Sequence, residues 1–175
     1  REHPEYLGTH PRTQDGELPV LIKFIDAKRD LSVQVHPSDD YAREYENGQS
    51  GKSEMWYILD AAPDAKLIYG FNRPLDKETL RKSLLDGTVE QYLQRVHIHK
   101  DDVFYIEAGT VHAIGAGALI AEIQESSNLT YRMYDYGRLD KDGKPRQLHI
   151  DRALDVARLD GGDVPRQPMR VLKYT

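Results

Sequence analysis

The sequence predicts a mainly β protein, an antiparallel sandwich or barrel with a small helical insertion. Short apolar segments, several of them alternating with polar residues, recur between about residues 18 and 134. Gly, Pro, Asp and Asn separate these segments at nearly regular intervals, which is typical of antiparallel all-β folds. One stretch, at about residues 74–95, instead has the apolar spacing of a helix. We therefore expect helices inserted into a framework of strands.

The composition excludes several functional classes. The 175 residues suffice for one sizeable domain. A net charge of −5 without a basic block gives no reason to expect nucleic acid as a partner. No apolar run approaches the roughly 20 residues that span a bilayer, so we expect no membrane partner. The absence of cysteine excludes disulfides and thiolate metal sites, and a cytoplasmic location is the default expectation.

The first half of the chain is expected to begin with an N-terminal loop segment at residues 1–17, rich in Pro and Gly. Residues 18–25 and 31–36 follow as strands. Ser38 and the two aspartates after it have the chemistry of a helix N-cap, which predicts a short helix over residues 40–46. Further strands are expected at residues 54–59, 66–69, 96–99, 103–106, 118–123 and 129–134.

The helical insertion begins after Pro74. Leu80, Leu84 and Leu85 fall on one face of a helix that Gly87 ends, and a second short helix is expected over residues 88–94. The tail, residues 148–175, is expected to hold a helix over 148–157 and a linker. Because the chain opens without Met and closes at Val171-Leu-Lys-Tyr-Thr175, which has the pattern of the start of a strand, we expect a segment of a longer protein.

Four residues are candidate metal ligands. Gln34 and His36 are two apart on a predicted strand, so both side chains point to one face. Glu54 begins another strand, and His112 follows a tight Gly-Thr turn. Two imidazoles, a carboxylate and an amide oxygen suit a divalent metal such as zinc. Taken singly, each has an ordinary structural explanation: an outward polar residue, an edge-strand histidine, a strand-initial charge or a turn cap.

The order of the motifs strengthens this interpretation. The stretch from Asp102 to His112, an apolar strand followed by a Gly turn and a His, resembles the second motif of cupin barrels. The arrangement Gln-x-His…Glu resembles a stretched first motif. Five further segments are informative: Ser32-Val-Gln-Val-His-Pro37, Lys52-Ser-Glu-Met-Trp-Tyr57, Tyr69-Gly-Phe71, Glu107-Ala-Gly-Thr-Val-His-Ala-Ile114 and Glu122-Ile-Gln-Glu-Ser-Ser-Asn-Leu-Thr-Tyr-Arg-Met-Tyr-Asp135. Through these segments, the chain from about residue 18 to 158 resembles the type I mannose-6-phosphate isomerases in their shorter bacterial form.

The resemblance implies a cupin (jelly-roll) β-barrel over residues 18–147, with a second barrel beyond residues 148–175 in full-length members. It implies one Zn²⁺ per chain, held by Gln34, His36, Glu54 and His112. The implied reaction is the aldose–ketose isomerisation of mannose 6-phosphate and fructose 6-phosphate through a cis-enediol. The expected partner is therefore a small-molecule sugar phosphate, with the oligomeric state open.

Arg132 and Lys52 are the candidate catalytic residues. The resemblance matches Arg132 to a motif arginine, whose guanidinium could hold an enediolate or a phosphate; the alternative is an ion pair with Asp135 or Glu125. Lys52 lies two residues before Glu54 and could act as a base or polarise the substrate; the alternative is an exposed loop lysine.

Lys23 and Ser32 are candidate substrate-binding residues. Lys23 lies in an apolar strand, where a buried ammonium needs a partner such as a phosphate. Ser32 is two residues before Gln34 and shares its face. Ser127 stands where some longer members have an Asp, so the proton-transfer base stays unassigned.

Two other functions compete with isomerisation. A non-catalytic cupin that binds a sugar phosphate would need the ligands but not turnover. A cupin oxygenase would favour a His-rich iron set. His97 and His99 form a second His-x-His pair, which we expect to be an ordinary polar strand face.

Overall fold

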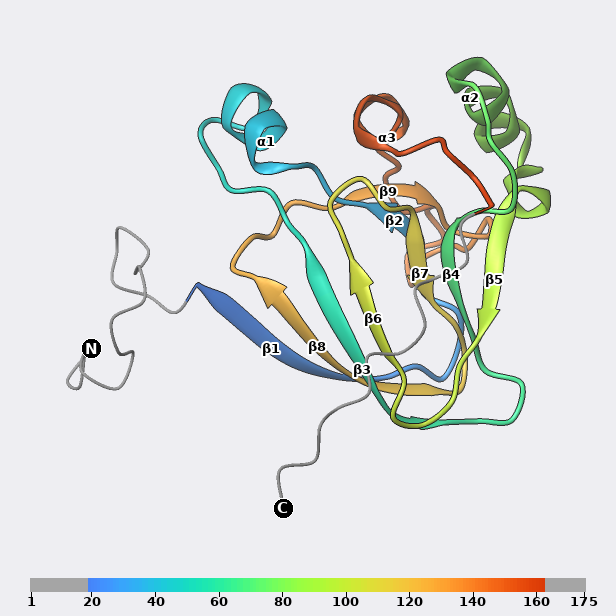
Figure 1. Ribbon diagram of the computed structural model, residues 1–175. Helices are drawn as coiled ribbons and strands as arrows, with labels where there is room; N and C mark the ends of the chain where they lie inside the picture. Colours follow the sequence, from blue (N-terminus) through green and yellow to red (C-terminus); the bar gives the residue numbers. More distant parts are fainter. Residues whose placement is uncertain (1–18, 163–175) are drawn as a thin grey trace, which may run out of the picture.

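Two antiparallel sheets face each other in the computed structural model, which describes residues 19–162 (Figure 1). Sheet A has the strand order β1-β8-β3-β6, and sheet B has the order β5-β4-β7-β2-β9. The strands of sheet A are β1 (Val20–Asp26), β8 (Ala118–Glu125), β3 (Glu54–Ala61) and β6 (Val103–Ile106). Those of sheet B are β5 (Leu93–His97), β4 (Lys66–Phe71), β7 (His112–Ile114), β2 (Val33–Val35) and β9 (Tyr131–Tyr134).

The mainly β, antiparallel prediction is confirmed. Among residues 19–162 the two sheets stay separate hydrogen-bonded ladders, so the architecture is a sandwich rather than a closed barrel. Alternation along β3 explains the layer between the sheets: Trp56 and Ile58 are fully buried, whereas Met55 and Tyr57 on the other face are partly exposed. Trp56 and Ile58 belong to a core that Leu67 and Ile114 of sheet B complete.

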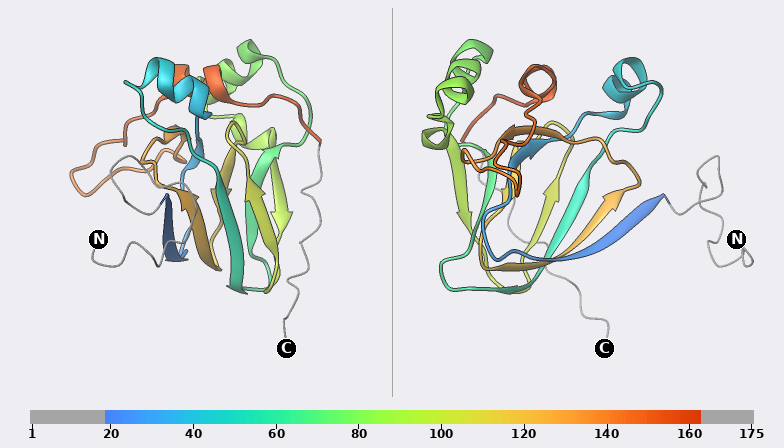
Figure 2. Two further views of the ribbon diagram at one scale, coloured as in Figure 1. Left: turned by 60° about the vertical axis from the view of Figure 1, so that its left-hand side comes forward. Right: turned by 180° about the vertical axis from the view of Figure 1, so that it is seen from behind.

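A second core lies between sheet B and the helices. The helices are α1 (Asp39–Tyr45), α2 (Lys77–Asp86), the 3₁₀ turn η2 (Val89–Gln91) and α3 (Ile150–Val156). The three α-helices lie at the same end of the molecule (Figure 2). Val33 and Val35 of β2 pack there with Leu80 of α2 and Leu154 of α3. The short strand β2 therefore has one face in this core, which leaves the face of Gln34 to the space between the sheets.

Two predicted caps are confirmed, one at the start of α1 and one at the end of α2. Ser38 accepts a hydrogen bond from the Tyr41 amide at the start of α1, and Gly87 ends α2 in the left-handed conformation. The helix expected over residues 88–94 is wrong in extent: only η2 forms, and β5 begins at Leu93. The reason is tertiary, because Leu93 pairs with Phe71 in sheet B and its backbone joins the ladder.

The first and last segments of the predicted domain organisation lie wholly or partly outside residues 19–162. The loop segment at residues 1–17 and the linker after residue 162 fall there, so both remain expectations. The predicted tail helix is present as α3. Within residues 19–162, none of the helices has the length and apolarity needed to cross a membrane.

Candidate metal centre

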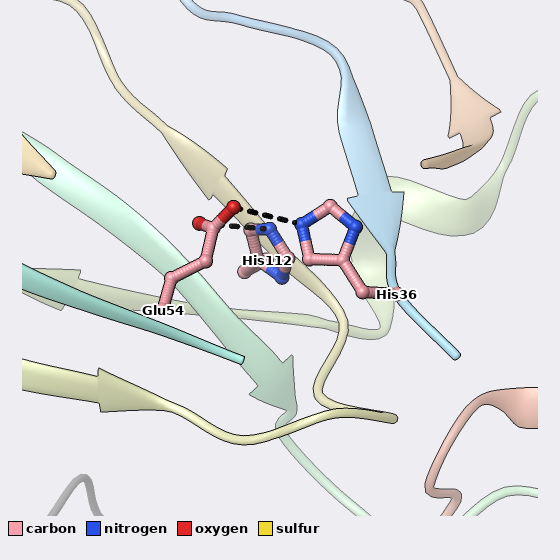
Figure 3. A group of neighbouring side chains, drawn as sticks. All are labelled: His36, Glu54 and His112. Atoms are coloured by element: carbon pink, nitrogen blue, oxygen red, sulfur yellow. Dashed lines mark ion pairs between the residues drawn. The ribbon is translucent and has the colours of Figure 1, made fainter. Parts of the chain in front are cut away.

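The four predicted ligands come together between the two sheets. Gln34 of β2 is directly paired with His112 of β7, so their side chains are neighbours on one face of sheet B. His36 follows the end of β2 and lies close to His112, with ring centroids 4.7 Å apart. Glu54 approaches from β3 in the facing sheet. Figure 3 shows the two imidazoles turned toward its carboxylate.

The donor atoms of three of these residues converge. His36 Nε2 lies 3.1 Å from Glu54 Oε1, and His112 Nε2 lies 3.9 Å from Glu54 Oε2. One ligand atom from each of the three residues lies within 4.8 Å of the others, and all three residues are buried. Because a metal ion accepts lone pairs from about 2 Å, donors that surround a common point at this spacing can share one.

Backbone carbonyls orient both imidazoles. His36 Nδ1 is 2.9 Å from the Leu129 carbonyl oxygen, and His112 Nδ1 is 2.8 Å from that of Thr110. A carbonyl oxygen only accepts, so each Nδ1 must carry the proton and donate it. Each Nε2 then offers its lone pair toward Glu54. This is the usual way in which proteins position metal-binding histidines.

One buried atom supports the fit to a metal. His36 Nε2 has no hydrogen-bond donor among the described residues and lies 3.1 Å from Glu54 Oε1, whose charged neighbour is Lys52. Buried polar atoms without partners are uncommon and call for a ligand or an ion. The Gln34 amide nitrogen lies 3.2 Å from His112 Nε2. Rotating this amide by 180° would place its oxygen, instead of its nitrogen, beside His112 Nε2. The four residues can then offer two imidazole nitrogens, a carboxylate and an amide oxygen to one divalent cation.

The electrostatics of the site favour an ionised Glu54 and a neutral His112. Burial alone would raise the pKa of Glu54, but its neighbours, among them the Lys52 ammonium at 2.8 Å, outweigh burial and hold the pKa well below its usual range. Burial, with the nearby His36, lowers the pKa of His112 to about 3. At neutral pH the site therefore has an ionised carboxylate and a neutral His112.

Lys52 lies within this site rather than in an exposed loop. Its Nζ is 2.8 Å from Glu54 Oε1, and only 5% of the residue is exposed. Gly51 beside it packs so closely on the backbone of Pro37 and Ser38 that a Cβ there would approach to 2.4 Å. The close packing of this loop places the Lys52 ammonium next to the candidate ligands.

A buried polar network extends the site along sheet A, and sequence reasoning missed its members. Trp56 Nε1 donates to Glu54 Oε2 at 3.0 Å and to Glu122 Oε2 at 3.2 Å. Glu122 is only 4% exposed. A signal existed in the sequence, because Glu122 interrupts an apolar strand and Trp56 is two residues from Glu54 on the same face.

Lys23 has a protein partner. Its Nζ lies 3.0 Å from Glu122 Oε1, and it also donates to the Gln124 side-chain oxygen. Because 41% of the Lys23 side chain is exposed, the ammonium is less deeply buried than the sequence suggested. A phosphate is therefore not needed to balance this charge.

Arg132 and Ser32 lie beside the ligands on sheet B. Arg132 pairs with Gln34 across the strands, and its Nε donates to Ser32 Oγ at 3.3 Å. Burial and the nearby Arg146 lower the pKa of Arg132. Asp135, one of the alternative partners considered for Arg132, instead accepts hydrogen bonds from Arg138 and Arg146. His97 and His99 are exposed and are not members of the metal-capable group found in residues 19–162.

Comparisons with known proteins agree with the resemblance. No family model matches the chain. The chain is 46% identical over 169 residues to the mannose-6-phosphate isomerase ManA of Bacillus subtilis, covering 94% of this chain and 52% of that protein. It is 43% identical over 155 residues to the mannose-6-phosphate isomerase of Streptococcus mutans, covering 89% of this chain and 48% of that protein.

Solved structures give the same result. The crystal structure of the Bacillus subtilis mannose 6-phosphate isomerase matches 94% of this chain and 50% of its own, with a TM-score of 0.82 at 41% identity. A phosphomannose isomerase variant from Salmonella typhimurium, at 16% identity and a TM-score of 0.67, supports the fold alone. The chain spans about half the length of the curated relatives it matches. The cupin fold is confirmed over that half, and over the same span the chain is similar in sequence and structure to mannose-6-phosphate isomerases.

Proposed function

We propose that this chain is the metal-binding half of an aldose–ketose isomerase that interconverts mannose 6-phosphate and fructose 6-phosphate. The observation that carries the proposal is the buried His36–Glu54–His112 group, in which one donor atom of each residue converges and His36 Nε2 has no hydrogen-bond donor in the described part of the chain. The proposed domain division is a cupin-type metal-binding domain, with the two-sheet architecture described above, over residues 18–147, followed over 148–175 by a helix and linker that lead to a second cupin domain in the full-length enzyme. A cytoplasmic location suits a phosphorylated sugar substrate.

The proposed cofactor is one Zn²⁺ per chain, held by Gln34, His36, Glu54 and His112. A single carboxylate among neutral ligands leaves net positive charge at the ion. When bound, the zinc would stabilise negative charge on a substrate oxygen. The residues around it would hold the ring-opened sugar and move the proton between C2 and C1.

Lys52 is proposed to act on a substrate oxygen. Its ammonium is fixed 2.8 Å from Glu54 Oε1, so it can donate a hydrogen bond beside the ligands as negative charge develops on the enediol. Glu122 is a candidate for the proton-transfer base. It is buried and shares the Trp56 N–H with Glu54, so its carboxylate lies within the same network.

Arg132, Ser32 and Lys23 are proposed to bind the phosphate or the enediol oxygens. Arg132 already donates to Ser32 Oγ beside Gln34, which places a guanidinium and a hydroxyl at the edge of the ligand set. A guanidinium binds phosphate oxygens with two parallel hydrogen bonds. Lys23 is partly exposed and could exchange a contact with Glu122 for one with an anionic substrate.

The test is interconversion of the two sugar phosphates before and after treatment with EDTA, with zinc then added back. We expect activity that chelation removes and zinc restores. Arg132→Ala and Lys52→Ala should lower it, whereas Arg95→Ala, on the partly exposed edge strand β5, should not. One bound zinc with no turnover would favour the non-catalytic sugar-phosphate-binding cupin, provided that a polypeptide of the relatives' full length is also inactive.

A further inference from the structure

The outer face of sheet A, the face turned away from sheet B, is apolar. Strand register places side chains from all four strands in two rows across this face. The first row is Ile22, Ile123, Met55 and Tyr105, and the second is Phe24, Ala121, Tyr57 and Val103. The two rows run at right angles to the strands. None of these eight residues is charged, so together they form a continuous, largely apolar surface.

Much of this surface is exposed. Phe24 is 74% exposed, Ile22 59% and Tyr105 58%. The corresponding outer face of sheet B differs, because α2 and α3 pack on it and bury residues such as Val33 and Val35. Figures 1 and 2 show the helices gathered away from β1, β8, β3 and β6. Contiguous apolar patches of this kind mark interaction surfaces.

The position of β1 adds a second indication. β1 is an edge strand, and within residues 19–162 it pairs only with β8. Natural proteins usually protect edge strands with charges, proline or a covering segment. The outward positions Ile22 and Phe24 of β1 have none of these. The exposed Ile22 and Phe24 therefore make this edge of sheet A a candidate contact surface.

The charged residues next to the two apolar rows indicate the charge expected on a protein surface that packs there. Asp26, Glu125 and Asp60 lie at outward positions next to the apolar rows. None of the outward positions in these paired strands is Lys or Arg. A second copy of the chain placed on this face would bring carboxylate near carboxylate, whereas a partner with basic residues around an apolar centre would be attracted.

The length of the relatives supplies the occupant. The chain accounts for 52% of the Bacillus subtilis relative, so a full-length relative has about as much polypeptide again that can cover a face of this half. We infer that the outer face of sheet A is the surface on which the other half of a full-length mannose-6-phosphate isomerase packs. Its contact would have an apolar centre over Phe24 and Ile22, with Lys or Arg facing Asp26, Asp60 and Glu125. This inference depends on the family relationship and not on activity.

Hydroxyl-radical footprinting tests the inference with two matched tyrosines. Tyr105 lies on the outer face and is 58% exposed, and Tyr45 lies on α1 and is 50% exposed. The proteins compared are the isolated chain and a full-length hybrid in which this chain replaces the matching half of the Bacillus subtilis relative. We expect oxidation of Tyr105 and Met55 to fall severalfold in the hybrid, with Tyr45 unchanged. Unchanged Tyr105, or protection of Tyr45 alone, would overturn the inference.

A second arm uses the full-length Bacillus subtilis relative itself, so that a hybrid that fails to fold leaves the question answerable. Lysine is introduced at the position aligned with Phe24 and, as a control, at the position aligned with Leu85, which is 69% exposed on α2. The first change should lower the midpoint of thermal unfolding by on the order of 5 °C, and the control should not. Equal effects would refute the proposed interface. Sedimentation of the isolated chain as a dimer that Phe24→Lys dissociates would instead identify a second copy as the occupant.

Discussion

Replacing Glu54 with glutamine should destabilise the metal-free protein strongly, although the shape of the side chain hardly changes. Glu54 is 2% exposed, and its Oε1 lies 2.8 Å from Lys52 Nζ. With an effective dielectric of about 20, Coulomb's law gives about 6 kcal/mol for two unit charges 2.8 Å apart. Glu54→Gln removes this attraction and leaves the Lys52 ammonium buried without its carboxylate. Losing one partner of a buried pair typically costs about 3–5 kcal/mol.

The double variant Glu54→Gln/Lys52→Met separates the unpaired charge from other effects. Methionine fills similar space without a charge, so the double variant should be at least about 2 kcal/mol more stable than Glu54→Gln alone. The assay is urea unfolding of chelator-treated protein, with the free energy extrapolated to water. Glu107→Gln is the control, since its exposed pair with Arg158 should contribute no more than about 1 kcal/mol.

Two results would contradict this reasoning. If Glu54→Gln lowered the free energy of unfolding by less than about 1 kcal/mol, the Lys52–Glu54 pair would not be a buried, desolvated contact. If Glu54→Gln/Lys52→Met were less stable than both Glu54→Gln and Lys52→Met, a group other than Glu54 would be the main partner of the Lys52 ammonium. Glu54→Gln should also weaken zinc binding, because it removes the carboxylate among the proposed ligands.

Three further predictions address the metal, the network and acid stability. Zinc should raise the midpoint of thermal unfolding, with one ion bound per chain by metal analysis; His36→Ala should abolish both effects and the exposed His97→Ala neither. Trp56→Phe removes the indole N–H that donates a hydrogen bond to Glu54, so it should weaken zinc binding about 10–100-fold in a chelator competition. Unchanged zinc affinity would show that Trp56 does not support the metal ligands. Burial would raise the pKa of Asp135, but hydrogen bonds from two arginines outweigh it and lower the pKa. The stabilisation from Asp135 is therefore present above its unfolded pKa of about 4 and is lost as the pH falls through the lower folded value. Wild type should be more stable than Asp135→Asn at pH 7 and lose that advantage in acid melts; a difference independent of pH would contradict this.

The sequence alone determined most of the strands and the candidate ligands, although β7 is not among the expected strand ranges and β5 begins earlier than expected. A strand has a period of two residues, so Gln34 and His36 could be assigned to one face, and Glu54 and His112 could be recognised at strand ends. The caps at Ser38 and Gly87 are equally local, because a helix terminus requires them wherever the helix packs. These features depend on residues that are close together in the chain, so they can be recognised without knowing the tertiary structure.

Only the tertiary structure decided which side chains meet across the sheets. Glu122 lies far along the chain from Trp56 and Lys23, and strand register alone brings the three together. The same long-range pairing places Leu93 in a strand where local spacing favoured a helix. It also leaves Phe24 exposed on sheet A, while the apolar residues of β2 lie beneath the helices. The pattern of a strand tells which residues share a face, but what covers that face depends on contacts between segments that are distant in sequence.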